Sequence, residues 1–227
     1  MPLRKVTDME DAWMELVFSS NALGLDGLTK DLVTGVEPHF VTWEDVGKKH
    51  RLVLRGELHA QAVFGDVNYR ADAGVIDFSK DIERAAGNQD SPRFKRYFVM
   101  APSRLVRRAL GAMAERIKGW IEGIKLEPEP AVKAHAGPLD KLADEAQATI
   151  NGVATAEGAT TTFRRRVVED FLDEVDAFRM DLQGELQKRA AKHKLGPEWV
   201  AKFFRPARRR ARRGPADEDG DETPPAK

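Results

Sequence analysis

Two groups of basic residues hold the side chains whose chemistry is clearest, because clustered arginines can neutralise phosphates without reading a base sequence. The first group lies near the C-terminus and comprises Arg205, Arg208, Arg209, Arg210, Arg212 and Arg213. The second group mixes basic and aromatic residues and comprises Arg93, Lys95, Arg96, Tyr97, Arg104, Arg107 and Arg108. Aromatic rings beside cations can stack bases. Both groups are therefore candidate sites for nucleic acid or for another acidic partner, and the second group is explained equally well as solvated loop residues.

The C-terminal arginines are followed closely by acids, at positions 217, 218, 219, 221 and 222. Blocks of like charge do not pack into an apolar core, so residues 205–227 are predicted to form a disordered tail, basic over 205–213 and acidic over 217–222. Three interpretations of its arginines stay open: a nucleic-acid arm, an arm for another acidic partner, or a terminus that only aids solubility. In the first two, the nearby acids would compete with the partner for the arginines.

A third basic run, Arg164 to Arg166, falls in a segment with helical periodicity. Glu169 and Asp170 follow four residues after Arg165 and Arg166. That spacing allows salt bridges on one helix face, which favours a structural role over an anion site.

No motif indicates catalysis, a cofactor or a metal. The absence of cysteine excludes disulfides and thiolate metal sites. None of the five histidines has a metal-ligand spacing to another, and there is no Glu-x-x-His, Gly-x-Ser-x-Gly or glycine-rich phosphate loop. The acids at 66, 72, 77 and 81 are interpreted as an ordinary helix surface. We therefore predict a protein that is not an enzyme and carries no cofactor.

Composition favours helices with one apolar stripe. Hydrophobic residues make up 41% of the 227 residues and charged residues 33%, with a net charge of +0. No run is long enough for a membrane span, and residues 1–13 lack the apolar stretch of a secretory signal. We expect a cytoplasmic protein without a transmembrane segment.

Prolines and caps outline the expected helices. The first starts at a capping box, Thr7 to Glu10, and stops before Pro38. Another is capped by Ser103 and runs to Leu126. The longest covers 139–192, with a break expected around 152–162, where glycines and threonines gather. A stop at 193–197 precedes a short helix over 198–204.

The segment from Thr42 to Ala86 leaves two structures open, above all over 51–78. Its apolar positions, among them Leu54, Leu58 and Val75, fit a long helix, but the alternation of polar and apolar residues also fits a β-hairpin. Helix is favoured because the alternating apolar residues are mostly alanine and because a lone hairpin would have no sheet to join.

These elements predict an all-α fold, an elongated antiparallel helical bundle of about four long helices and one short C-terminal helix. Residues 1–204 would form this coiled-coil-like domain and 205–227 the tail. The function expected is a non-enzymatic scaffold or adaptor, or a self-associating structural protein, acting through helix faces. The alternative is a nucleic-acid-associated protein that binds phosphates through the C-terminal arginines.

Overall fold

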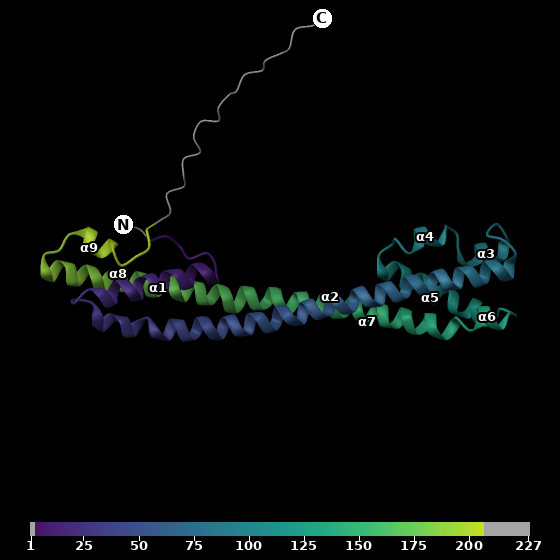
Figure 1. Ribbon diagram of the computed structural model, residues 1–227, viewed down its shortest axis with the longest axis horizontal. Coiled ribbons are helices and arrows are strands. Elements are labelled where there is room, and N and C mark those ends of the chain that lie inside the picture. The colour runs from purple at the N-terminus through teal and green to yellow at the C-terminus, as the bar shows by residue number, and fades with distance from the viewer. Residues whose placement is uncertain (1–2, 207–227) are drawn as a thin grey trace, which may run out of the picture. The chain divides into compact units, whose positions relative to one another are not determined.

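The computed structural model describes residues 3–206, and all regular elements in this range are helical, which confirms the all-α prediction (Figure 1). The predicted tail lies outside the described residues from 207 onward. The elements are α1 (Met9–Leu25), η1 (Lys30–Gly35), α2 (Glu37–Ala86), α3 (Pro92–Tyr97), α4 (Pro102–Leu105), α5 (Leu110–Lys125), α6 (Pro130–Lys133), α7 (Ala136–Phe163), η2 (Arg164–Val168), α8 (Glu169–His193) and α9 (Pro197–Ala201).

The chain folds into two compact units. Of the described residues, 3–41 and 172–206 form unit 1, and 42–171 form unit 2. The predicted domain boundary after residue 204 stays a prediction.

In unit 1, α1 packs with α8 and α9 around buried apolar side chains. Asp8 caps α1 by accepting a 2.8 Å hydrogen bond from the backbone N–H of Asp11, so the predicted capping box at Thr7 is one residue too early. The interior is formed by aliphatic and aromatic residues from both ends of the chain: Leu16, Leu23, Val175, Leu182, Leu186, Val200 and Phe203.

The end of α8 follows the predicted stop. Lys194 adopts a left-handed backbone with φ of 55°, and Pro197 then opens α9. The turn brings Phe203 back to α1, where its carbonyl accepts a 2.9 Å hydrogen bond from the hydroxyl of Ser19. The C-terminal end of the described chain is therefore fixed within unit 1.

Unit 2 is built on α2, which is one uninterrupted helix, so the β-hairpin alternative is wrong for residues 51–78. The residues that α2 turns inward recur at alternating steps of four and three, which is the period of a coiled-coil seam. A strand with this spacing would not place all of these residues on one side. These seam positions are Val46, His50, Val53, Glu57, Ala60, Phe64, Val67 and Ala71. The helix also starts earlier than predicted, with Pro38 in its first turn, where proline costs no hydrogen bond.

α7 runs antiparallel to α2. Arg70 donates a 2.7 Å hydrogen bond to Glu145, and near the far end of α7 the rings of His50 and Phe163 stack at 5.9 Å. The expected break around 152–162 is wrong: α7 is continuous there, and the irregularity is the π-helical turn η2, which follows directly. We call the paired parts, residues 47–66 of α2 and 147–163 of α7, the hairpin segment.

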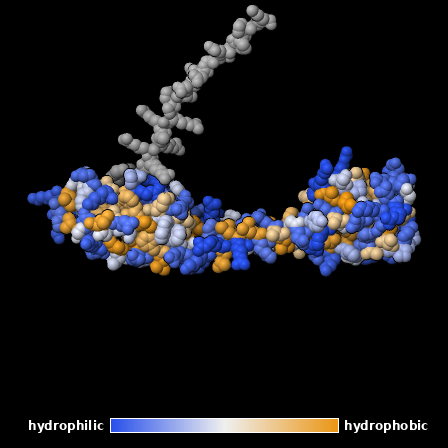
Figure 2. All heavy atoms as spheres, viewed as in Figure 1, coloured by the Kyte–Doolittle hydropathy of each residue, from blue (hydrophilic) through white to orange (hydrophobic). Residues whose placement is uncertain are grey.

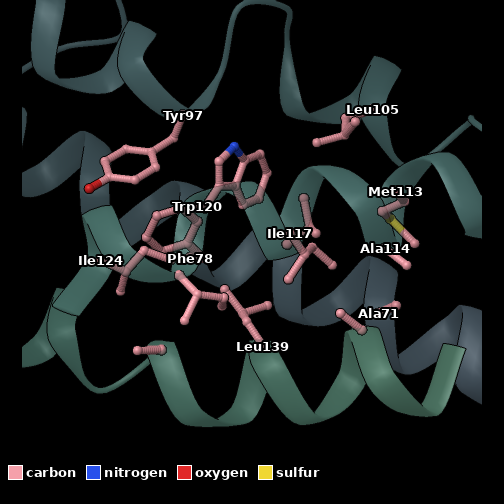
Figure 3. Close-up of a cluster of buried hydrophobic side chains, with 14 of the residues drawn as sticks. Ala71, Phe78, Tyr97, Leu105, Met113, Ala114, Ile117, Trp120, Ile124 and Leu139 are labelled. Carbon is pink, nitrogen blue, oxygen red and sulfur yellow. The ribbon is translucent and has the colours of Figure 1, made fainter. Parts of the chain in front are cut away.

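The core of unit 2 lies where α2, α5 and α7 meet the short helices (Figure 3). Phe78 is at its centre, with ring centroids 5.2 Å from Tyr97 and 5.6 Å from Trp120. The predicted helix 103–126 is in fact two, α4 and α5, separated by a turn, and Ser103 does not cap the longer one. This turn lets α3 and α4 cover α5.

Candidate interaction surfaces

Much of the basic and aromatic group over 93–108 is engaged within unit 2. Arg93 donates to Glu127 at 2.8 Å and also pairs with Glu129, and these hydrogen bonds, that of Glu129 first, raise the pKa of Arg93. Arg96 lies 3.6 Å from Glu127 and Lys95 lies 3.0 Å from Asp90. These three cations therefore already have carboxylate partners.

Tyr97 is buried in the core, with 1% of its surface exposed. Its hydroxyl donates a 2.7 Å hydrogen bond to Glu127, and burial, followed by the contact with Glu127, raises the pKa of Tyr97 to about 12. A ring in this position packs against Phe78 and Trp120. It does not present a face on which a base could stack.

Arg104, Arg107 and Arg108 are exposed, and within residues 3–206 none of them has an ion-pair partner. Arg108 and Arg116 line a hollow of about 290 Å³ beside Tyr97 and Leu105. The structure thus separates the seven predicted residues into two sets: those over 93–97, which are either paired with a carboxylate or buried, and three exposed arginines without an acidic partner among residues 3–206.

Of the six predicted C-terminal arginines, the structure describes only Arg205. Its guanidinium lies 3.5 Å from Asp11 and 3.8 Å from Glu15, inside unit 1. Arg208, Arg209, Arg210, Arg212 and Arg213 lie outside the described residues.

The arginines of η2 do not form the expected salt bridges. Arg164, Arg165 and Arg166 are exposed and none has an acidic partner in the described chain, Glu169 and Asp170 included. The π-helical turn explains this, because hydrogen bonds from i to i+5 change the angular offset on which a four-residue pairing depends. Three exposed cations of unit 2 thus have no acidic partner within residues 3–206.

The hairpin segment has no buried interior of its own. No residue over 47–66 and none over 147–167 is buried, although the first range contains large apolar side chains. Leu52 is 67% exposed and Leu58 65%. Figure 2 shows that hydrophobic residues also reach the molecular surface. In the sequence, Leu54 and Leu58 support only the prediction of a helix. Their exposure could not be recognised before the seam was known.

The α7 half of the hairpin segment is almost uncharged and made of small residues. Glu157 is its one charged side chain between 147 and 163. Exposed positions include Ala148, Gly152, Gly158 and Ala159, and an added Cβ at either glycine would meet nothing within 4 Å. A helix surface without charges or long side chains can let another helix approach closely.

Among residues 3–206 there is no cluster of three or more metal-ligating side chains, and no helix is long and apolar enough to cross a bilayer. Comparison of the chain with protein-family models, with curated proteins and with solved structures gives no match. The site must therefore be argued from its own geometry.

Proposed function

We propose that the protein is a self-associating helical scaffold and that the hairpin segment is the surface on which a second copy docks. Two observations together carry the proposal. Leucines on α2 are exposed, and neither helix has a buried residue along this part. Two helices alone bury a seam on one side only, and further helices are needed to enclose it.

The surface of the hairpin segment is complementary to the same surface on a second copy. It carries protruding side chains, Leu52 and Leu58, on α2 and small side chains on α7, so a two-fold contact can place the leucines of each copy on the small residues of the other. Arg51 and Arg55 lie beside the leucines without an acidic partner among the described residues, and Glu157 lies on α7. Opposite charges can therefore also meet across the same contact.

Substitution of the two leucines tests this surface. Burying a leucine contributes about 1.5–3 kcal/mol, so Leu52→Glu with Leu58→Glu should weaken self-association by about a hundredfold or more. Sedimentation equilibrium of the full chain measures the association constant, and circular dichroism checks that helix content is kept. Leu126→Glu is the matched control, since Leu126 is 83% exposed in unit 2 but outside the hairpin segment. A wild-type chain that stays monomeric at high micromolar concentration would refute the proposal.

A second candidate function is non-specific binding of nucleic acid, favoured by the free arginines of η2 together with the predicted C-terminal arm. Binding should then weaken steeply with salt. Replacing Arg164, Arg165 and Arg166 by glutamine, and separately ending the chain after Pro206, should each lower the affinity for single-stranded RNA or DNA and reduce its salt dependence. Unchanged affinity in both variants would exclude this function.

A further inference from the structure

Unit 1 contains a hollow of about 680 Å³ that has both apolar walls and a strongly polar side. Phe18, Phe204 and Ala201 contribute apolar surface, and Arg4, Arg179 and Arg205 contribute guanidinium groups. Its volume lies within the range of about 300–1,000 Å³ found for small-molecule sites, which are mostly apolar with a few convergent polar groups.

The polar side belongs to a buried ionic network. Arg179 is 2% exposed and donates hydrogen bonds to Glu15 at 2.9 Å, to Asp176 at 2.9 Å and to the carbonyl of Arg4 at 2.7 Å. Glu15 is 1% exposed. Arg4 pairs with Asp11, so the network holds both ends of the chain together: the first residues, α1 and α8.

The charges of this network are balanced. Three cations (Arg4, Arg179, Arg205) face three carboxylates (Asp11, Glu15, Asp176) through the ion pairs of unit 1. A buried network of this kind is stable only when its charges and its hydrogen bonds are both satisfied.

The hydrogen bonds, unlike the charges, are incomplete. The Nε of Arg179 and the Nη1 of Arg205 are buried and have no acceptor. Both residues line the hollow with other parts of their side chains, since these two nitrogens have no accessible surface of their own. Arg179 is held in place by three hydrogen bonds, whereas the ion pairs of Arg205 are long, at 3.5 and 3.8 Å, so Arg205 is the residue that can turn its free donor toward the hollow. A buried donor without a partner costs about 1–3 kcal/mol, so such groups usually have an acceptor that completes them.

We propose that the hollow binds a small, uncharged, mostly apolar molecule whose carbonyl-type oxygen accepts a hydrogen bond from Arg205. The missing component is an acceptor and not a charge, because the three carboxylates already neutralise the three arginines. The lining also includes Lys202, which is paired with Asp26 at 2.7 Å, and Glu198. A ligand carboxylate would therefore add an unbalanced negative charge, which is unfavourable. The apolar body of the ligand would lie against Phe18 and Phe204.

Three probes of similar size distinguish a ligand with a neutral acceptor, a purely apolar ligand and a carboxylate ligand. They are acetophenone, ethylbenzene and benzoate. Ligand-observed NMR titrations of the full chain measure their affinities. Acetophenone should bind about tenfold or more tightly than ethylbenzene, because a hydrogen bond to a charged donor is worth about that factor or more. Benzoate should bind more weakly than acetophenone. Equal binding of acetophenone and ethylbenzene, tightest binding of benzoate, or binding of none of the three would overturn the proposal.

Two variants locate the site. Ala201→Trp fills the hollow from α9 and should abolish acetophenone binding, whereas Ala191→Trp, at an exposed position of α8, should leave it unchanged. Arg205→Met removes one free donor while Asp11 and Glu15 keep Arg4 and Arg179, so the fold should be kept. This variant should bind ethylbenzene as before and lose most of its preference for acetophenone. Binding that survives Ala201→Trp, or a preference that survives Arg205→Met, would contradict the assignment.

Discussion

Gly123 of α5 lies directly against the ring of Tyr97: a Cβ at position 123 would be 3.1 Å from the hydroxyl oxygen and 3.3 Å from the nearest ring carbon. The ring cannot move away easily, since it is buried and its hydroxyl is bonded to Glu127. The missing side chain of Gly123 is therefore what allows α3 to pack onto α5.

Gly123→Ala should destabilise unit 2, whereas Gly119→Ala, on the same helix with nothing within 4 Å of an added Cβ, should stabilise it. Alanine gains up to about 1 kcal/mol over glycine inside a helix, but at 123 the steric conflict with Tyr97 should outweigh this gain. Urea unfolding measures both variants. A stabilised Gly123→Ala protein would show that the ring adjusts at little cost.

Tyr97→Phe should lower the free energy of unfolding by about 1–2 kcal/mol, because the buried carboxylate of Glu127 loses one donor while Arg93 and Arg96 remain near it. The pKa of Tyr97, raised to about 12, offers a second measurement. Alkaline titration followed by tyrosinate absorbance should show Tyr97 ionising only near pH 12. Full ionisation near pH 10 would contradict the buried contact.

Asp72 should destabilise unit 2 at neutral pH. Burial raises its pKa, and its Oδ1 has no donor. The folded protein therefore binds the proton more tightly than the unfolded chain, and stability falls as pH rises from about 4, the unfolded value, through the folded pKa.

Asp72→Asn should raise the free energy of unfolding at pH 7 by about 1 kcal/mol, and the difference should vanish near pH 3. Asp66→Asn, which removes an exposed pair with Arg70 at 2.9 Å, is the control and should give little or a slightly negative change. An Asp72→Asn effect that does not vary with pH would exclude the ionisation as its cause.

His39 should make unit 1 sensitive to mild acid. Burial lowers the pKa of His39, against a smaller opposing effect of Glu174, whose carboxylate oxygen is 3.6 Å from Nδ1. The folded state thus favours the neutral ring, so its stability is full above pH 6.5 and declines as pH falls from that value through the lower folded pKa.

His39→Gln should flatten the decline in stability between pH 7 and pH 5. His59→Gln, at an exposed position of α2, serves as the control and should leave the pH dependence of unfolding as in the wild type. Chemical unfolding at a series of pH values, followed by tryptophan fluorescence, measures the slope; Trp13 and Trp199 of unit 1 contribute to this signal together with two tryptophans of unit 2. An unchanged slope in His39→Gln would assign the decline to other groups.

Several elements could be predicted from local sequence. The period of apolar residues established helices, and the His193 to Pro197 stop was correct because Pro197 holds the residue before it, Gly196, in an extended backbone. The left-handed residue at this stop is Lys194 and not the glycine. Where a helix starts or breaks was less predictable: Pro38 lies inside α2, Ser103 does not cap α5, and the irregularity after α7 falls on arginines instead of glycines. Tertiary packing overrode local propensity at these points.

The candidate surfaces depended still more on the tertiary structure. The sequence by itself determined that this chain is helical, lacks cysteine chemistry and concentrates arginines in a few places. Only the fold decided that Arg93 and Arg205 are paired with carboxylates distant in sequence, that Arg164–Arg166 have no acidic partner in the described part of the chain, and that Leu58 is exposed. Periodicity fixes which residues share a helix face, whereas the partner of that face is set by long-range contacts that no local pattern records.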